Sequence, residues 1–554
     1  MRIKLQTLAY LLLVALVMQI ALMSCSPAQL PVTPEVIREV VRETVIVEGT
    51  PQIIEREVIR EVTPTVVPQP ATGEKVLNIG LYQDFTGLLP ASGGGGWPLF
   101  TINFGFYDPL LEYNDAMELM PGLAQSWSFE DNDTTMVLQL QEGVTFHDGT
   151  PFNAEAVKVN LERYINPTGI VIWDLTNAIE SIEVVDEYTV RLHFTEPNIN
   201  MIYNLAQDPG FMISPTALNE HGEEWLSQNP VGTGPFVFER WEPGTELVMV
   251  RNPNYWREGL PKVDRVVWKI LVDNTVRSIS MVTGEINIET FVPPKDYDAL
   301  RSDENLNLWV QPGGLAMITF NHTDPPFNIK ENREAVKYAV DYEAISEIVY
   351  YGLADAPTGG PFPTGMWPYD PDRPKLQRDL ERARESLVQA GNPDGFSIDI
   401  VYEPDDIGQQ LAEIVQASLS EVGIQVNLIR TDFARFIEVL QADRDAVQMA
   451  IFTYGRMRVN AEEFFLNDWM CDGSNAFANW CNSELDETVL QAMTTFDHEE
   501  RLELLRKAED IFIEDVAGVP LAYPPFIHAS NVRVLDYSIH PIGLLNFRWL
   551  DLAN

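Results

Sequence analysis

Residues 230–238 of this chain read Pro-Val-Gly-Thr-Gly-Pro-Phe-Val-Phe, and residues 251–256 read Arg-Asn-Pro-Asn-Tyr-Trp. Glycines on both sides of Thr233, followed by Pro235, form a turn that few other residue types adopt. The apolar residues that come next predict a strand, and Asn-Pro-Asn ends a second one. These residues carry no catalytic chemistry, so the stretch indicates a scaffold.

Several other blocks of the chain accompany this stretch. They are Tyr-Asp-Pro-Leu-Leu at 107–111, Gly-Leu-Ala-Gln-Ser-Trp at 122–127, Gly-Val-Thr-Phe-His-Asp-Gly-Thr-Pro-Phe at 143–152 and Arg-Glu-Ala-Val-Lys-Tyr-Ala-Val-Asp at 333–341. Together these blocks resemble the extracellular solute-binding proteins of bacterial ABC importers, in the branch (family 5 type) that handles peptides, nickel and some oligosaccharides. Asp108 stands where that family more often has Glu. The resemblance spans residues 76–554.

The resemblance implies an α/β fold of the periplasmic-binding-protein type, a two-lobed flytrap with an extra inserted subdomain. We expect a first lobe of residues 76–106, 228–312 and 520–554, an inserted subdomain of 107–227, and a far lobe of 313–519. The strand-helix-strand alternation over residues 396–430 independently predicts α/β structure in the far lobe. Hinges are expected near Gly313-Gly314 and Gly518-Val519-Pro520, where they would let the lobes close over a ligand.

The amino terminus has the pattern of a secretory signal. Arg2 and Lys4 precede an apolar run that ends in Leu-Met-Ser-Cys at residues 22–25. The run is short for a membrane-spanning helix, which needs about 20 apolar residues. Cys25 after Ser24 resembles a lipobox, so we expect residues 1–25 to be a lipoprotein signal peptide and Cys25 to be lipidated. An ordinary signal peptide with an incidental Cys, or an uncleaved anchor, is the alternative.

Residues 26–75 are predicted to be a flexible stalk. Pro, Thr and Val are frequent, and no aromatic residue occurs. The segment Val-Ile-Arg-Glu-Val at 36–40 returns at 58–62. Such a segment buries too little apolar surface to offset the entropy of ordering, although transient helix or strand is compatible with the recurring Val and Ile.

Composition places residues 76–554 in a soluble, acidic, extracytoplasmic class. The chain holds 82 acidic and 37 basic residues, for a formal net charge of −45, which argues against nucleic acid and against adhesion to anionic lipid. Seven scattered His show no metal-ligand spacing, so we predict no metal and no cofactor. We expect a monomer on the outer face of the cytoplasmic membrane or in the periplasm, partnered by the permease of an ABC transporter.

The remaining two cysteines, Cys471 and Cys481, bracket a short polar loop. Cysteines in an extracytoplasmic protein favour a disulfide, and the pair lacks the spacing and the neighbouring His of a zinc site. We therefore predict a disulfide.

Ligand contacts are expected at strand ends and in irregular loops of both lobes. The candidates are Asp84, Phe85, Trp97, Asn321, Trp367 and the segment Tyr454-Gly455-Arg456-Met457-Arg458. For Trp97, Trp367 and Phe362 a ligand-stacking face competes with ordinary core packing. A structural role competes at Asn321, and His147 is interpreted as structural.

The segment that contains Met457 bears on the ligand class. In peptide-binding relatives an Asp of this segment pairs with the α-ammonium group of the ligand. Met457 stands at that position, and a thioether forms no such charge-assisted bond. Arg456 and Arg458 would meet ligand carboxylates or hydroxyl groups, or else form ion pairs within a very acidic protein.

We therefore predict a non-enzymatic, importer-linked binding lipoprotein with an oligopeptide as ligand. An oligosaccharide is the alternative ligand. A secreted acidic glycoside hydrolase is the alternative from another class, since its chemistry needs two facing carboxylates, and a sensor that reports to a membrane partner is a third reading. Motifs typical of zinc proteases, serine hydrolases and P-loop enzymes are missing from the sequence.

Overall fold

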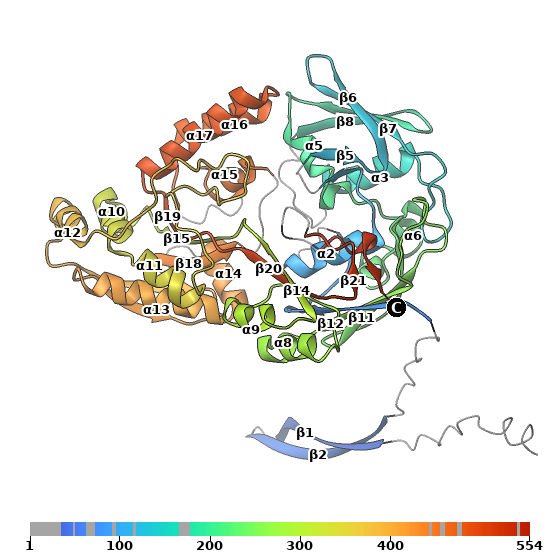
Figure 1. Ribbon diagram of the computed structural model, residues 1–554, viewed down its shortest axis with the longest axis horizontal. Helices are drawn as coiled ribbons and strands as arrows, with labels where there is room; N and C mark the ends of the chain where they lie inside the picture. The colour runs from blue at the N-terminus through green and yellow to red at the C-terminus, as the bar shows by residue number, and fades with distance from the viewer. Residues whose placement is uncertain are drawn as a thin grey trace, which may run out of the picture. The chain divides into compact units, whose positions relative to one another are not determined.

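The computed structural model describes residues 35–47, 50–62, 73–90, 96–114, 118–165, 178–441, 446–454, 460–471, 473, 479–539, 543 and 545–553. The chain divides into two compact units, Met1–Gly73 and Glu74–Asn554. Each unit is described by itself below, and Figure 1 shows the elements of both.

The first unit contains a hairpin where the sequence predicts a flexible stalk. Strand β1 (Glu35–Val47) pairs antiparallel with β2 (Thr50–Val62) along their whole length. The repeated segment pairs with its own copy, since Ile37 lies opposite Arg60 and Arg38 opposite Ile59. Val and Ile favour the extended backbone, so these two segments form strands within the stretch for which a stalk is predicted.

The second unit begins with a seven-stranded sheet in the order β10-β11-β12-β3-β13-β20-β14. Strand β3 runs parallel to β12 and β13, and the other neighbours are antiparallel. All its strands come from residues 76–81, 236–311 and 526–531. They are β3 (Val76–Leu81), β10 (Phe236–Glu242), β11 (Glu246–Arg251), β12 (Arg265–Ile270), β13 (Ile288–Glu289), β14 (Leu306–Gln311) and β20 (Phe526–Asn531).

Helices α2 (Gly96–Phe106), α8 (Asn274–Val282) and α9 (Tyr297–Arg301) accompany this sheet, with the short turns η2 (Pro294–Asp296) and η5 (Phe547–Trp549). The edge pair β21 (Val534–Leu535) and β22 (Asp551–Leu552) follows near the end of the chain. Strand β3 buries Leu77, Ile79 and Leu81 completely or nearly so, because these alternate residues share one face of a central strand.

A five-stranded sheet has the order β17-β16-β18-β15-β19, with β16 parallel to both of its neighbours. Its strands are β15 (Leu315–Phe320), β16 (Ser397–Tyr402), β17 (Gln425–Ile429), β18 (Met449–Tyr454) and β19 (Gly518–Ala522). The helices around it are α10 (Lys330–Ala339), α11 (Tyr342–Ala344), η3 (Ile345–Val349), α12 (Leu380–Gln389), α13 (Asp406–Ser420), α14 (Phe433–Gln441), α15 (Glu462–Asp468), α16 (Ser483–Thr494) and α17 (His498–Glu514).

This sheet is buried on both faces, and strand alternation assigns each residue to one of them. Ala316, Ile318 and Phe320 of β15 join the core made with α10, α12 and α13, whereas Leu315 and Met317 join the core that contains α15 and α17. The α/β character predicted for residues 396–430 is confirmed by the parallel β16-α13-β17 unit.

A four-stranded antiparallel sheet, β6-β7-β9-β8, forms a third body with its own core. Its strands are β6 (Ala124–Glu130), β7 (Thr135–Leu140), β8 (Ile179–Asp186) and β9 (Thr189–Phe194), beside the hairpin of β4 (Leu111–Tyr113) and β5 (Leu119–Pro121). Helices α3 (Ala154–Ile165), α5 (Asn200–Asn204), α6 (Pro215–His221) and α7 (Glu223–Leu226) and the turn η1 (Asp208–Gly210) complete it.

Two connections join the seven-stranded and five-stranded sheets. One runs from β14 to β15 through Gly314, and the other runs from β19 to β20 through Pro524. They lie side by side, because the Gly314 N–H donates to the Pro524 carbonyl at 2.9 Å. The second crossing was expected at Gly518–Pro520, and that expectation is wrong: these residues pair with β15, so the chain leaves the five-stranded sheet only after Ala522.

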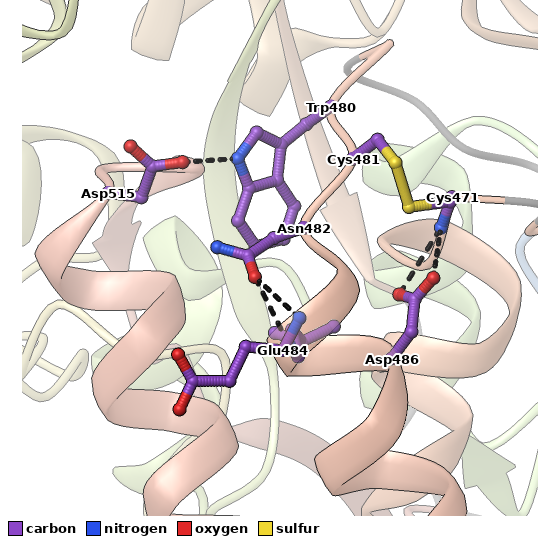
Figure 2. Close-up of a disulfide and its surroundings, with 8 residues drawn as sticks. Cys471, Trp480, Cys481, Asn482, Glu484, Asp486 and Asp515 are labelled. Atoms are coloured by element: carbon purple, nitrogen blue, oxygen red, sulfur yellow. Dashed lines mark hydrogen bonds between the residues drawn. A yellow bond between two sulfur atoms is a disulfide. The ribbon is translucent and has the colours of Figure 1, made fainter.

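The predicted disulfide between Cys471 and Cys481 is present (Figure 2). It ties the end of the α15 region to the start of α16, where Asn482 Oδ1 accepts from the N–H groups of Glu484 and Leu485 at 3.0 and 3.2 Å. Asp486 of α16 accepts from the Cys471 N–H at 3.3 Å. The bond therefore reinforces a helix start that is already capped.

Replacing both Cys471 and Cys481 with Ser is expected to lower the free energy of unfolding by up to about 3 kcal/mol. The reason is the loop entropy released in the unfolded chain when two residues 10 apart in sequence are no longer joined. Urea unfolding with and without a reductant measures the effect. The double variant should not respond to the reductant, and an equal response of both proteins would contradict the prediction.

The buried imidazole of His322 gives the fold an acid-sensitive element. Its Nε2 donates to the Ala517 carbonyl at 2.8 Å, and burial together with the Arg333 charge lowers the pKa of His322 to about 3. In the unfolded chain the pKa is about 6.5. A depressed folded pKa means that stability is present above pH 6.5 and is lost as the pH falls below it.

Between pH 6.5 and 5 we expect this residue to cost up to about 1.4 kcal/mol of stability per pH unit. His322→Gln should flatten the pH dependence of the urea midpoint over that range. His221→Gln, at an exposed position, is the matched control and should keep the slope of the parent protein. Parallel curves for His322→Gln and the parent would refute the assignment.

Candidate functional site

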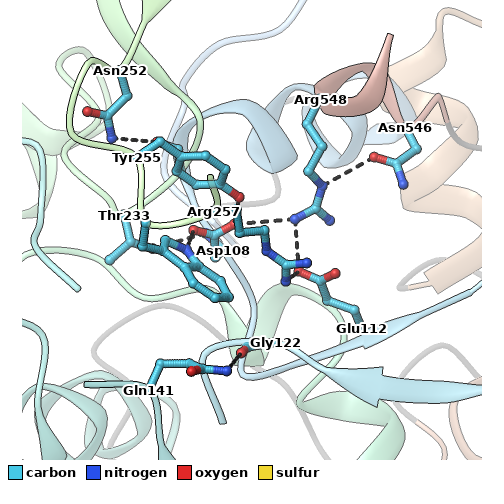
Figure 3. A network of polar contacts seen from close by, with 12 residues as sticks. Asp108, Glu112, Gly122, Gln141, Thr233, Asn252, Tyr255, Arg257, Asn546 and Arg548 are labelled. Atoms are coloured by element: carbon cyan, nitrogen blue, oxygen red, sulfur yellow. Dashed lines mark hydrogen bonds and ion pairs between the residues drawn. The ribbon is translucent and has the colours of Figure 1, made fainter. Parts of the chain in front are cut away.

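The quoted signature residues form a buried polar network around Asp108 (Figure 3). The Asp108 carboxylate accepts from Tyr255 Oη at 2.8 Å and Trp256 Nε1 at 2.9 Å, and Arg548 Nη1 lies 3.3 Å from it. Thr233 Oγ1 accepts from the Asp108 N–H at 3.3 Å. The network thus joins the Gly-Thr-Gly turn, the Asn-Tyr-Trp segment and the carboxyl-terminal η5 turn.

Close packing explains the glycines of that turn. A Cβ on Gly232 would lie 2.2 Å from the Phe106 carbonyl oxygen, and a Cβ on Gly234 would lie 2.5 Å from the Phe106 carbonyl carbon. Neither residue tolerates a side chain without moving backbone. The signature stretch is therefore structural, as the sequence analysis predicts.

Tyr82 and Glu403 lie at strand ends of the two larger sheets. Tyr82 directly follows β3, and Glu403 directly follows β16. Burial and then the negative charge of Glu403 raise the pKa of Tyr82. The carboxyl ends of parallel strands are where α/β proteins place ligands, so these two residues mark a candidate site.

Glu403 is held by the neighbouring strand. Its Oε2 accepts from the N–H and the hydroxyl of Thr453 on β18, at 3.1 and 2.6 Å. Burial, reinforced by the charge of Asp405, raises the pKa of Glu403 to about 7 against the effect of the Thr453 hydrogen bonds. On the seven-stranded sheet, the Tyr82 ring contacts the Phe291 ring, at 4.7 Å between centroids.

A second contact joins the four-stranded body to α15 and α17. Arg501 binds Glu462 through both carboxylate oxygens, at 2.6 and 2.8 Å, and both residues are buried. Arg501 also donates to Tyr203 Oη at 3.1 Å and to Asn200 Oδ1 at 3.4 Å on α5. We call these four residues the Arg501 cluster.

Further contacts surround the Arg501 cluster. The Ile199 N–H donates to the Met493 carbonyl at 2.9 Å, and Phe129 meets Phe496 edge to face at 4.8 Å. Figure 1 shows α16 and α17 beside the β6-β7-β8 sheet, in agreement with these contacts. The four-stranded body is therefore packed, through α5 and β6, against the helical part of the five-stranded body.

Two buried amides lack partners among the described residues. Both amide atoms of Asn460, which is 1% exposed, are without a hydrogen bond, and the same holds for the fully buried Asn103 on α2. Buried polar groups in native proteins are nearly always paired. Asn460 directly follows the candidate ligand-binding segment 454–458 and Val459, so a bound ligand is a candidate hydrogen-bond partner for its amide.

The contacts of Asp84 and Phe85, the residues predicted after β3, are with their own loop and with the core. Asp84 Oδ1 accepts from the Phe85 N–H at 2.8 Å and shapes its own loop. Phe85 is 3% exposed and stacks on Trp241 at 4.9 Å, so its ring belongs to the core. Trp97 lies in the first turn of α2 rather than in a loop, and its side chain is outside the described residues.

Two other predicted residues have mainly structural partners. Asn321 forms a turn after β15, because its Oδ1 accepts from the Thr323 N–H at 3.1 Å and its Nδ2 donates to Asp324 at 3.1 Å. Tyr454 ends β18 and donates to Asp468 Oδ2 at 2.9 Å. The structural role that competes at Asn321 therefore accounts for its contacts.

Trp367 lies at the Arg501 cluster. Its ring is 5.1 Å from the Arg501 guanidinium carbon and 4.4 Å from the ring of His498. Phe362 is fully buried against Phe464 and Phe465, so it packs in the core. The structural interpretation of His147 agrees with its hydrogen bonds to Gly234 O and from Gly232 N, at 3.0 and 3.3 Å.

Gly455, Arg456, Met457 and Arg458 lie outside the described residues, as does Cys25. Over the part of the chain that the structure describes, no group of three or more His, Cys, Asp or Glu is arranged to hold a metal ion. In the same part, no helix has both the length and the apolar character needed to span a bilayer.

Sequence reasoning missed Tyr82 and Glu403, although the signal was present. The strand predicted over Phe396–Tyr402 ends immediately before Glu403, and polar residues at strand ends were the stated criterion. The loop chosen after β3 began two residues too late, at Asp84. Asn200 and Tyr203 had no such signal, because they lie 301 and 298 residues from Arg501 in the sequence and meet it only in the fold.

The chain matches the family model described as bacterial extracellular solute-binding proteins, family 5 middle, over residues 118–476. It is 30% identical over 514 residues to the glutathione-binding protein GsiB of Pectobacterium atrosepticum, covering 89% of this chain and 97% of that relative. It is also 30% identical over 469 residues to GsiB of Escherichia coli strain K12, covering 81% and 89%.

Solved structures show the same fold at lower identity. A periplasmic binding protein DppA from Helicobacter pylori in complex with the peptide STSA has a TM-score of 0.77 at 24% identity, covering 86% of this chain and 98% of that one. NikA from Brucella suis in complex with Fe(III)-EDTA has a TM-score of 0.78 at 21% identity, covering 87% and 100%. These likenesses confirm the predicted α/β flytrap fold with an extra subdomain.

Proposed function

Because this chain belongs to family 5 of the bacterial extracellular solute-binding proteins, we propose that it captures a peptide-like ligand and delivers it to the permease of an ABC importer. The observation that carries the ligand class is the match to the glutathione-binding protein GsiB over 97% of that relative. Complexes of the fold with the peptide STSA and with the dipeptide Met-Leu support the same class. Membership of a binding-protein family excludes the glycoside hydrolase alternative.

The proposed capture uses the two lobes of the fold. We assign residues 76–106, 228–312 and 523–554 to the first lobe, 107–227 to the inserted subdomain and 313–522 to the far lobe. The ligand would lie between Tyr82 of the first lobe and Glu403 of the far lobe. The paired connections at Gly314 and Pro524 would serve as the hinge, which absorbs the rotation of one lobe against the other.

Ligand binding is tested by thermal unfolding of the non-lipidated chain from residue 26 onward. The probes are glutathione, Met-Leu, the tetrapeptide Ser-Thr-Ser-Ala, cello-oligosaccharides and a nickel chelate. A ligand present at 100 times its dissociation constant adds roughly 2.7 kcal/mol of stability, which raises the midpoint measurably. Stabilisation by glutathione or a peptide supports the proposal, whereas stabilisation by the oligosaccharides alone would replace it.

We also propose that Cys25 carries the lipid anchor and places the protein on the outer face of the cytoplasmic membrane. Stable anchoring without a spanning helix requires two acyl chains or a second signal. Cys25→Ser is expected to move the protein from the membrane fraction to the soluble fraction, and mass spectrometry of the membrane form should find the acylated Cys25. Recovery of Cys25→Ser in the membrane fraction would contradict this assignment.

A further inference from the structure

Only one of the two carboxylate oxygens of Glu403 accepts hydrogen bonds from the described residues. Thr453 occupies Oε2 with two hydrogen bonds, and no described residue donates a hydrogen bond to Oε1. Glu403 is only partly buried, so Oε1 remains within reach of a bound molecule. The backbone is also fixed, because the Glu403 N–H donates to the Ile451 carbonyl at 3.0 Å. The result is a positioned acceptor with one oxygen available.

Tyr82 of the seven-stranded sheet is the residue of the first lobe on which the charge of Glu403 acts. Its ring rests on Phe291, and its hydroxyl makes no hydrogen bond with a described residue. Phe291 itself has a φ of 58°, a backbone conformation that is unfavourable for a large side chain and that clusters at functional sites. Tyr82 and Glu403, from different sheets, thus each carry a polar group and have no hydrogen bond with each other.

Within the described residues, no Lys, Arg or His forms an ion pair with Glu403 or its neighbour Asp405. The nearby cation on the opposite side, Arg277, is already committed: it lies 3.2 Å from Glu289 and donates to Leu271 O and Asn274 Oδ1 at 2.8 and 2.7 Å. A carboxylate in this setting lacks the counter-charge that buried acids normally have. Burial accordingly raises the pKa of both Glu403 and Asp405.

We infer that Glu403 is the acceptor for the ammonium group of the ligand. This inference rests on the proposed function and specifies it. Met457 supplies no carboxylate in the segment where peptide-binding relatives have Asp, and Glu403 would supply that charge from the end of β16 instead. An ammonium donating to Oε1 forms a charge-assisted hydrogen bond, while Oε2 stays with Thr453. Tyr82 would enclose the same group from the other lobe.

The test compares Met-Leu with N-acetyl-Met-Leu by calorimetry in the parent protein and in Glu403→Gln. The parent is expected to bind the free peptide at least about tenfold more tightly than the acetylated one, since only the free amine is charged. Glu403→Gln should bind the two peptides with equal affinity, because the amide keeps an acceptor oxygen and loses the charge. Asp399→Asn on the same strand is the control and should keep the tenfold preference.

The outcomes are distinguishable. Equal affinity of the parent for both peptides, or a preserved preference in Glu403→Gln, would overturn the role of Glu403 and leave the proposed function standing. A parent protein that binds neither peptide, nor glutathione or Ser-Thr-Ser-Ala, would overturn the proposed function and this inference with it. Thermal unfolding without ligand checks that Glu403→Gln is folded, so a lost preference reports on recognition.

Discussion

Arg501→Met is expected to lower the free energy of unfolding by about 3–5 kcal/mol, because it leaves Glu462 buried without its counter-charge. The Arg501 side chain is 4% exposed and Glu462 is fully buried, so water does not replace the lost partner. Burial lowers the pKa of Arg501, but the Glu462 charge and hydrogen bonds outweigh burial and raise it overall. The pair is therefore strongly coupled, and urea unfolding measures the loss.

Two further variants separate this effect from a general one. Lys507→Met on the same helix removes an exposed ion pair with Glu484 and should cost no more than about 1 kcal/mol. Arg501→Met combined with Glu462→Met removes both charges and should be more stable than Arg501→Met alone. If the double variant is the less stable of the two, the buried-charge explanation fails.

Arg501→Met should also weaken ligand binding. The Arg501 cluster joins α5 of the inserted subdomain to α15 and α17 of the far lobe. Its loss therefore destabilises the state of the protein in which the subdomain and the far lobe are in contact. The apparent affinity for a ligand falls in proportion to the fraction of molecules in the binding-competent state. Calorimetry with glutathione on Arg501→Met and Lys507→Met measures this, and unchanged affinity in Arg501→Met would show that the contact does not influence closure.

Arg548→Met is expected to cost a similar 3–5 kcal/mol through the Asp108 network. Arg548 is 3% exposed and lies 2.8 Å from Glu112 and 3.3 Å from Asp108. Arg257 stays bound to Glu112 at 2.7 Å, so Asp108 is the carboxylate left with only the neutral donors Tyr255 and Trp256. Arg533→Met, which removes only exposed bonds to the Ala553 carbonyl, is the control and should cost less than about 1 kcal/mol.

The loss in Arg548→Met should depend on pH with a defined sign. Burial raises the pKa of Asp108, and the charge of Arg548 opposes that rise. Without Arg548 the folded pKa rises further above the unfolded value, so the stability of the variant falls as the pH rises through it. Arg548→Met is therefore expected to lose more stability relative to the parent at pH 8 than at pH 5. A loss that is the same at both values would contradict this reading of Asp108.

Local patterns predicted much of the architecture. The strand after residue 75, the Gly-Thr-Gly turn, the β16-α13-β17 unit and the Cys471–Cys481 bond follow from alternation, turn chemistry and cysteine spacing, which act over a few residues. The stalk was predicted from its lack of aromatics, whereas Val and Ile at regular intervals form the β1-β2 hairpin instead. The second crossing is expected near Gly518-Val519-Pro520, but these residues lie within β19.

The candidate site was predicted less well, for a physical reason. Phe85 and Asp84 are polar and aromatic residues at a strand end, but one packs on Trp241 and the other caps its own loop. Tyr82 and Glu403 qualify only because β3 and β16 belong to different sheets and the charge of Glu403 still acts on Tyr82. The side of a strand end that faces the neighbouring sheet depends on packing between segments that lie hundreds of residues apart in the sequence.

The sequence by itself determined the class of this protein, an acidic, extracytoplasmic solute-binding chain. The turn glycines and signature blocks that identify the class consist of residues adjacent in the sequence. Only the tertiary structure decided which charges are buried together, since Arg501 meets Asn200 and Arg548 meets Asp108 across about 300 and 440 residues of chain. Contacts between residues so far apart in the sequence depend on how the hydrophobic cores pack, and no local sequence pattern predicts them.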